Sequence, residues 1–373
     1  MKKFVLIPDS FKGTLSSTTI CEIMAERISE RFSDAKVVSV PVADGGEGSV
    51  DCFLSSLGGQ KKQVQCKGPY MEDVSSFYGV LSDGKTAVVE MAAAAGLPMV
   101  EDRKNPLLTT TYGVGELILD AAKQGVERII VGLGGSCTND FGCGAASACG
   151  IKFFDKDGKE FIPVGGTLSD VRSIDFSNKD KALNNVEIIT MCDIDNPPYG
   201  LNGAAHVFAP QKGADGVMVE ELDKGVKHLS NLLTEMQKID YANLSGGGAA
   251  GAMGAGMVAF FNSQLKMGID TVLETVNFSE LIKDADYIFT GEGKIDSQSV
   301  RGKVVAGVAK SAKLQNKKVI CVVGGAEGDL SEAYKLGVTA IFTINRLPQD
   351  FSISRHNSEG NLRFAMDNVL RLL

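Results

Sequence analysis

The sequence predicts an α/β fold with a doubly wound parallel sheet, into which a second, mixed α/β domain is inserted. Five strongly apolar runs each end in a polar cluster rich in Gly, Asp and Asn, at residues 4–13, 38–48, 129–140, 188–196 and 287–296. Such runs are typical of parallel strands that are covered by helices on both faces. Strand and helix patterns alternate at both ends of the chain, and 373 residues are enough for two domains.

The N-terminal segment begins the doubly wound domain with two strand–helix pairs, which we expect at residues 4–7, 16–32, 36–42 and 49–57. The first helix places Ile20, Met24 and Ile28 on one face, and Ser16 or Thr19 can cap it. The second helix is followed by two glycines, which commonly end a helix.

The middle of the chain predicts a mixed sheet. We expect short strands at residues 64–66, 77–81, 86–91, 128–131, 187–191 and 206–208, with an Asp-Gly hairpin turn at 83–84. We expect helices at residues 113–124, 142–149, 217–237 and 249–262.

From residue 286 the chain returns to regular alternation. Strands are expected at residues 287–290, 319–323 and 340–343, and helices at 299–313, 331–336 and 359–372. We therefore expect residues 1–60 and 280–373 to form the doubly wound domain, and residues 61–279 to form the inserted mixed domain.

Composition excludes several classes of function. The formal net charge is −8 and no block of Lys and Arg is present, so neither a nucleic-acid partner nor an anionic membrane is expected. The N-terminal apolar run is too short for a signal peptide, which predicts a cytoplasmic protein. Eight cysteines form no CxxC pair and the three histidines form no cluster, so a zinc, redox or histidine-based site is not indicated.

Residues of the loops after the first two strands are candidates for binding a substrate or a phosphate: Ser10, Lys12, Asp44, Gly45, Gly46 and Glu47. A turn alone can explain an Asp-Gly pair. Three glycines around one Asp and one Glu instead favour a ligand pressed against the backbone. Lys12 would offer a point charge to a phosphate or a carboxylate.

The loop after the strand at 128–131 is a candidate anion site, formed by Gly134, Gly135, Ser136, Thr138, Asn139 and Asp140. Successive glycines can form a nest of backbone N–H donors, to which Ser136 and Thr138 add hydroxyls. The alternative is that Asn139 and Asp140 only cap the next helix.

Two further loops carry candidate catalytic carboxylates. Asp193 and Asn196 follow a buried strand, and their oxygens suit Mg²⁺, although Asp193 can equally be a general base or cap a turn. Lys294, Asp296 and Arg301 combine acid and base within a few residues. Arg301 is expected in the first turns of a helix, where a cation opposes the dipole, so we expect an anionic ligand nearby.

The segment 246–251 matches a GxGxxG pattern but does not follow a convincing strand. Gly247 and Gly248 can bind a phosphate at the N-terminus of the next helix. The alternative, dense helix packing through small residues, is the simplest interpretation of this motif taken alone.

The chain resembles the bacterial type I glycerate kinases from end to end. The resemblance lies in motifs at residues 8–13, 41–48, 90–92, 110–116, 134–140, 192–197, 210–214, 246–251 and 290–293. It implies ATP-dependent phosphorylation of D-glycerate to 2-phosphoglycerate. It also implies two α/β domains, one of them Rossmann- or flavodoxin-like, with the active site in the interdomain cleft.

Several details stay open at the level of the sequence. Because a protein of net charge −8 cannot neutralise a triphosphate by itself, we expect Mg²⁺ together with ATP. Lys12, Lys294 and Arg301 would supply positive potential. The general base would be Asp193 or, second, Asp296 or, third, Asp44. Phosphorylation of the 3-hydroxyl is an alternative. An NAD-dependent hydroxy-acid oxidoreductase is a remote one, because no dinucleotide fingerprint follows the first strand. The expected partners are small molecules, with the chain as a monomer or homodimer.

Overall fold

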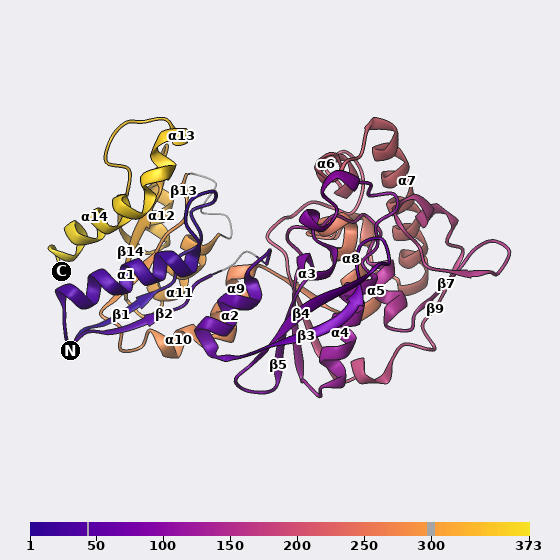
Figure 1. Cartoon of the computed structure of the whole chain (residues 1–373), viewed down its shortest axis with the longest axis horizontal. Helices are drawn as coiled ribbons and strands as arrows, with labels where there is room; N and C mark the ends of the chain where they lie inside the picture. Colours follow the sequence, from indigo (N-terminus) through magenta and orange to yellow (C-terminus); the bar gives the residue numbers. More distant parts are fainter. Residues whose placement is uncertain (43–44, 297–302) are drawn as a thin grey trace. The chain divides into compact units, whose positions relative to one another are not determined.

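The computed structural model describes residues 1–42, 45–296 and 303–373 and divides into two compact units. Unit 1 comprises Met1–Ala43, Asp51–Gly58 and Met267–Leu373, and unit 2 comprises Asp44–Val50 and Gly59–Lys266. The path of the chain from one unit to the other and back can be followed by colour in Figure 1. The predicted domain boundaries near residues 60 and 280 stay a prediction.

The described residues of unit 1 form a five-stranded parallel sheet with the order β16-β14-β12-β1-β2. Its strands are β1 (Lys3–Leu6), β2 (Lys36–Ser39), β12 (Tyr287–Thr290), β14 (Lys318–Val323) and β16 (Val338–Thr343). Numbered along the chain, these strands have the order 2-1-3-4-5, which is the flavodoxin-like doubly wound order. The predicted fold class is therefore confirmed, and the direction of winding reverses between β1 and β12.

Helices cover both faces of this sheet. They are α1 (Ser17–Arg31), α2 (Ser49–Leu57), α9 (Gly268–Thr275), α10 (Phe278–Leu281), α11 (Val304–Lys313), α12 (Ser331–Leu336), α13 (Phe351–Ser354) and α14 (Ser358–Leu370). Phe4 and Leu6 pack into a core with α1 and α14, while the alternating residue Val5 is buried as well. Ser16 caps α1 by accepting a hydrogen bond from the backbone N–H of Thr19 over 3.1 Å.

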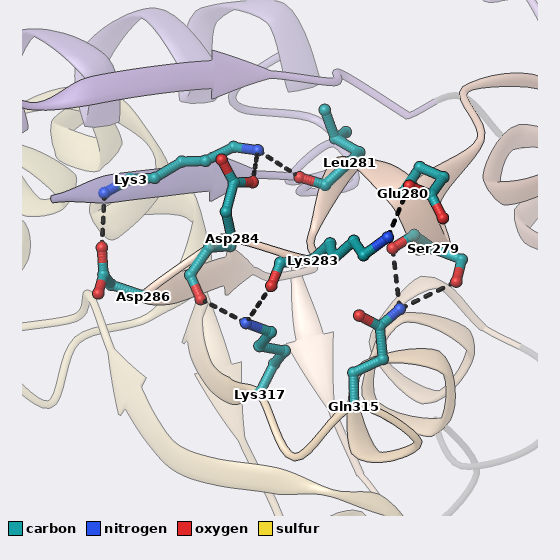
Figure 2. A network of polar contacts seen from close by, with 10 residues as sticks. Lys3, Ser279, Glu280, Leu281, Lys283, Asp284, Asp286, Gln315 and Lys317 are labelled. Carbon is teal, nitrogen blue, oxygen red and sulfur yellow. Dashed lines mark hydrogen bonds and ion pairs between the residues drawn. The ribbon is translucent and has the colours of Figure 1, made fainter.

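A polar network fastens the amino edge of the sheet in unit 1 (Figure 2). The backbone N–H of Lys3 donates to Asp286 over 2.7 Å, and its ammonium donates to the carbonyl of Leu281 over 2.6 Å and pairs with Asp284. Lys317 donates to the carbonyl of Lys283, which follows α10 in the chain, over 2.7 Å. Of the polar loops singled out in the sequence, those after β1 and β12 lie at the carboxyl ends of these strands, at the opposite edge of this sheet.

The described residues of unit 2 form a six-stranded mixed sheet with the order β11-β10-β6-β5-β4-β3. Its strands are β3 (Gly59–Lys67), β4 (Asp73–Leu81), β5 (Thr86–Glu90), β6 (Arg128–Gly132), β10 (Glu187–Met191) and β11 (Gln264–Lys266). The pairs β3–β4 and β4–β5 are antiparallel, whereas β5, β6, β10 and β11 run parallel. Loops after β5, β6 and β10 therefore leave the same edge of this sheet.

The remaining elements of unit 2 surround that sheet. The helices are α3 (Ala92–Ala95), α4 (Tyr112–Lys123), α5 (Cys143–Ala148), α6 (Ala204–Phe208), α7 (Gly216–Gln237) and α8 (Ala249–Phe261). A small antiparallel sheet has the order β8-β7-β9, with β7 (Lys152–Phe154), β8 (Glu160–Phe161) and β9 (Ser173–Asp175). In unit 1, β13 (Lys294–Ile295) and β15 (Gly325–Ala326) form a further short pair.

Two sequence predictions are wrong in detail. Residues 206–208, predicted as a strand, belong to the helix α6, because a run of three residues has no period that separates strand from helix. The helix predicted at residues 299–313 is wrong at Lys303, which is the N-cap of α11 and precedes its first turn, while residues 299–302 lie outside the described residues. Among the described residues, no helix combines the length and apolarity needed to cross a bilayer.

Candidate functional site

The predicted site residues divide between the carboxyl edges of the two sheets. In unit 1, the backbone N–H of Asp9, after β1, donates to the carbonyl of Gly291, after β12, over 2.8 Å. The hydroxyl of Thr290 also donates to the carbonyl of Ile7 over 2.9 Å. These two loops flank the point where the winding reverses, which is where open α/β sheets bind their ligands. The structure therefore brings the loop of Ser10 and Lys12 beside the loop of Lys294 and Asp296.

The charges at this edge are mostly exposed. Lys12 and Lys294 are exposed, and Asp296 is half-buried. Lys294 forms an ion pair with Glu327, which raises the pKa of the lysine. Arg301 lies outside the described residues, so its predicted role is not tested. These side chains can approach an anionic ligand from solvent.

Glu292 is a residue at this edge that was not predicted to belong to the site. Its side chain is buried, and one oxygen lies 3.9 Å from the ammonium of Lys303. A buried carboxylate at the reversal point is unusual, because burial disfavours the charged form. The Gly-Glu-Gly motif at residues 291–293 was the sequence signal that could have identified it.

In unit 2, the loops after β2 and β6 meet backbone to backbone. The N–H of Gly134 donates to the carbonyl of Gly45 over 2.9 Å. A Cβ atom added at Gly134 would lie 2.5 Å from the Cα of Gly46, so only glycine allows this approach. Gly45, Gly46 and Gly134 are thus brought together, with Glu47 exposed beside them and Asp44 outside the described residues.

Glu90, at the end of β5, holds the same loop and was also missed. Its buried carboxylate accepts hydrogen bonds from the backbone N–H groups of Gly48, over 3.2 Å, and Val50, over 2.5 Å. These donors belong to the first turn of α2 and the residue before it, where a carboxylate satisfies unpaired N–H groups. Glu90 therefore fixes the glycine loop that ends at α2.

Asp140 is enclosed by donors of its own unit. Its carboxylate accepts hydrogen bonds from the backbone and hydroxyl of Thr111, both over 2.8 Å, and from the N–H groups of Gly142 and Gly144. Burial raises the pKa of Asp140, and these hydrogen bonds oppose the rise. Such contacts fit the capping alternative for Asp140, and its binding role stays a prediction.

Thr138 and Asn139 differ from Asp140. Both side chains have no exposed area, and neither the Thr138 hydroxyl nor either polar atom of the Asn139 amide has a hydrogen-bond partner among the described residues. Leaving such groups unsatisfied costs about 1–3 kcal/mol each. A bound group or a buried water can supply such partners, which fits the predicted binding role of this loop.

Lys212 is a third residue that the site prediction missed. It ends a short 3-10 turn, Pro210–Lys212, and is 2% exposed. Its ammonium donates to the hydroxyl of Ser136 over 2.8 Å and to the carbonyl of Thr138 over 2.7 Å. Burial lowers the pKa of Lys212 to about 8, which the neighbouring Cys137 and Asp140 oppose. The sequence signal was the motif at residues 210–214.

The loop after β10 packs against the glycine segment 246–248. The backbone N–H of Gly248 donates to the carbonyl of Asn196 over 2.9 Å, and a Cβ atom at Gly248 would lie 2.3 Å from the carbonyl oxygen of Pro197. This is the packing alternative predicted for the motif, and phosphate binding by Gly247 and Gly248 stays a prediction. The next residues are strained, because Ala250 and Ala252 have φ angles of 54° and 65°.

The same loop can contribute to a magnesium site. Asp193 is exposed, and the amide nitrogen of Asn196 donates to the carbonyl of Asn202 over 2.8 Å, which orients that side chain. Within the described ranges no group of three or more His, Cys, Asp or Glu residues is placed to hold a metal ion. Mg²⁺ often binds one or two protein oxygens together with substrate phosphates, so Asp193 and Asn196 fit that manner of binding.

Comparisons with known proteins agree with one another. The model of the glycerate kinase family matches residues 4–373. A glycerate kinase of Bacillus cereus is 42% identical over 368 residues, which are 98% of this chain and 97% of that protein. The glycerate 2-kinase of Escherichia coli K12 is 42% identical over 343 residues, which are 92% of this chain and 90% of that protein. The crystal structure of a protein provisionally named glycerate kinase 2, from Salmonella typhimurium LT2, is similar with a TM-score of 0.88 at 39% identity, and covers 100% of this chain and 98% of that chain.

Proposed function

Because the chain belongs to the glycerate kinase family, we propose that it transfers the γ-phosphoryl group of ATP to the 2-hydroxyl of D-glycerate and forms 2-phosphoglycerate. Family membership makes the protein a kinase. The choice of the 2-hydroxyl is supported by the name of the Escherichia coli relative. Formation of 3-phosphoglycerate is the alternative outcome.

The unsatisfied side chains of Thr138 and Asn139 are the observation that carries the proposal. D-Glycerate and ATP both carry several oxygen atoms. These oxygens can accept hydrogen bonds from the amide nitrogen of Asn139 and the hydroxyl of Thr138. The hydroxyl groups of either ligand can also donate a hydrogen bond to the amide oxygen of Asn139. The loop after β6 is therefore the place where we expect a substrate oxygen to be recognised.

Phosphoryl transfer has a loose transition state, so catalysis requires positioning of the substrates and charges that stabilise the phosphoryl group rather than a covalent intermediate. Lys12 and Lys294 would attract the negative charge of the phosphates or of the glycerate carboxylate. Asp193 would accept the proton of the attacking hydroxyl, with Asp296 as the second candidate.

A magnesium ion would be held by Asn196 together with the phosphates, and also by Asp193 if Asp296 is the base. When bound, Mg²⁺ neutralises the charge that develops on the phosphate oxygens. We also propose a cytoplasmic location, where ATP is available, with small molecules as the partners and a monomer or homodimer as the active form.

The test is a coupled assay of ADP release in the presence of Mg²⁺ and ATP. D-Glycerate should release one ADP per acceptor consumed, and omission of the acceptor should leave only a slow background. A parallel assay with NAD⁺ and D-glycerate should show no reduction of NAD⁺. ATP turnover that does not depend on D-glycerate would contradict the proposal.

A further inference from the structure

Lys212 has an unusual environment for a lysine. It is almost completely buried, yet its two hydrogen-bond acceptors, the hydroxyl of Ser136 and the carbonyl of Thr138, are both neutral. Among the described residues no carboxylate forms an ion pair with it. Burying a charge without an ion pair is costly, so the charge itself calls for an explanation beyond packing.

The backbone of the loop is already fixed without Lys212. The N–H of Leu97 donates to the carbonyl of Gly135 over 2.8 Å, and the N–H of Cys137 donates to the carbonyl of Ala95 over 3.0 Å. The hydroxyl of Thr109 also donates to the carbonyl of Cys137 over 3.0 Å. Because these bonds anchor both sides of Ser136, the ammonium is not required merely to hold the loop in place.

The hydrogen bond from Lys212 has a consequence for Ser136. An ammonium can only donate, so the Ser136 oxygen is the acceptor and the hydroxyl proton must point to a different group. Ser136 is thereby presented as a donor, next to Thr138 and Asn139, which lack partners among the described residues. A donor hydroxyl with a positive charge directly behind it suits an anionic oxygen.

We propose that Lys212 is a positioning residue of the substrate site, which orients the Ser136 hydroxyl and places positive charge behind the loop 134–140 for an anionic oxygen of the substrate. The inference rests on the proposed function of this loop. Two sources of that oxygen are possible, the carboxylate of D-glycerate and a phosphate of ATP. They share the chemistry of a negatively charged oxygen, and the experiment below separates them.

The charge on Lys212 should be sensitive to alkaline pH. Its lowered pKa of about 8 means that the ammonium becomes a neutral amine as the pH rises through this value. The titratable groups that face it are Cys137, whose pKa is raised to about 12 by burial, and Asp140, whose carboxylate is held by Thr111 and two backbone N–H groups. A neutral amine still donates hydrogen bonds, so a fall in affinity above pH 8 reports the charge.

The experiment compares Lys212→Met with Lys224→Met, which makes the same change at an exposed lysine of α7. KM for D-glycerate, KM for MgATP and kcat are measured between about pH 6.5 and 9.5, with thermal unfolding recorded for each variant. Lys212→Met should raise one KM at least about tenfold, as expected for the loss of a charged hydrogen-bonding group. It should also abolish the alkaline rise of that KM, while Lys224→Met should behave like the wild type.

The KM that rises identifies the ligand: D-glycerate if the carboxylate is bound, MgATP if a phosphate is bound. Partial recovery in Lys212→Arg would support a role of the charge. A folded Lys212→Met enzyme with both KM values unchanged would overturn the inference, and so would an alkaline rise that persists in it.

If Lys212→Met does not fold, calorimetric titration of the wild type with D-glycerate and with MgATP across the same pH range decides the question. Constant affinity for both through pH 8 would overturn the inference. Failure of the proposed function is seen separately, because the wild type would then release no ADP on addition of D-glycerate, whereas MgATP binding would still test Lys212.

Discussion

Lys294 forms an ion pair with Glu327, which joins the loop after β12 to the segment after β14 at the carboxyl edge of the sheet in unit 1. Both side chains are more than half exposed, at 57% and 69%. Exposed ion pairs of this kind are weak because water screens them, so the pair does not prevent Lys294 from binding an anion. The carboxylate of Glu327 nevertheless places a negative charge beside Lys294, where the proposed anionic substrate needs a positive charge.

Removing the cations of this edge should weaken catalysis. We expect Lys12→Ala and Lys294→Ala each to lower kcat/KM at least about tenfold, because a charge-assisted hydrogen bond contributes roughly 1.5–3 kcal/mol. Glu327→Gln should have the opposite effect and raise kcat/KM about two- to fivefold, because it releases Lys294 from the ion pair. The control is Lys283→Ala, in the network at the amino edge (Figure 2), which should leave kcat/KM unchanged. Unchanged kinetics in both Lys12→Ala and Lys294→Ala would place these cations outside the site.

The general base can be identified by two single substitutions. Asp193→Asn should reduce kcat by about 10²-fold or more, the range of general-base catalysis, while the affinity for ATP stays nearly constant. Steady-state kinetics and ATP titrations measure the two effects. If Asp193→Asn turns over normally and Asp296→Asn is inactive, Asp296 is the base. Normal turnover of both variants would mean that the base is elsewhere or that the loose transition state needs none.

Activity should depend on a divalent cation. The exposed Asp193 and the Asn196 side chain offer few oxygens, and a chain of net charge −8 cannot balance a triphosphate alone. Excess EDTA should therefore abolish ADP release, and added Mg²⁺ or Mn²⁺ should restore it. The assay is the one used for glycerate-dependent turnover, and full activity in excess EDTA would refute the requirement.

Asn139→Leu separates a binding role from a structural one. Replacing a buried, unsatisfied amide by an apolar side chain of similar size should leave the melting temperature unchanged or raise it, because the cost of the unpaired groups disappears. If a substrate oxygen pairs with the amide, kcat/KM should fall at least about tenfold at the same time. Thr138→Val is the companion variant. A lower melting temperature with normal kinetics in both would show that these side chains are structural.

The fold was largely predictable from the sequence because its strands are short, apolar and followed by polar turns. Alternation placed β1, α1, β2 and α2 close to their observed bounds. The strand β3 begins earlier than predicted, since its first residues, Gln60, Lys61 and Lys62, are polar and belong to an edge strand. The flavodoxin-like order of unit 1 depends on pairings between distant segments, which no local pattern shows.

The positions of candidate site residues were predictable where these residues follow strand ends, as Ser10 and Lys294 do, because parallel strands deliver their following loops to one edge. Lys212 was not predictable in this way. It is 76 positions away from Ser136, and a lysine in an isolated motif is most simply interpreted as solvated. Only the tertiary structure shows that it is buried beneath the loop.

The most direct test of the central proposal is the structure of the product. After complete turnover of D-glycerate with MgATP, the phosphorus resonance of the product is recorded without proton decoupling. The proposal predicts a doublet, because the phosphate of 2-phosphoglycerate is next to a carbon with one hydrogen. A triplet, from the two hydrogens beside the phosphate of 3-phosphoglycerate, would contradict the proposed choice of hydroxyl while leaving the family assignment intact.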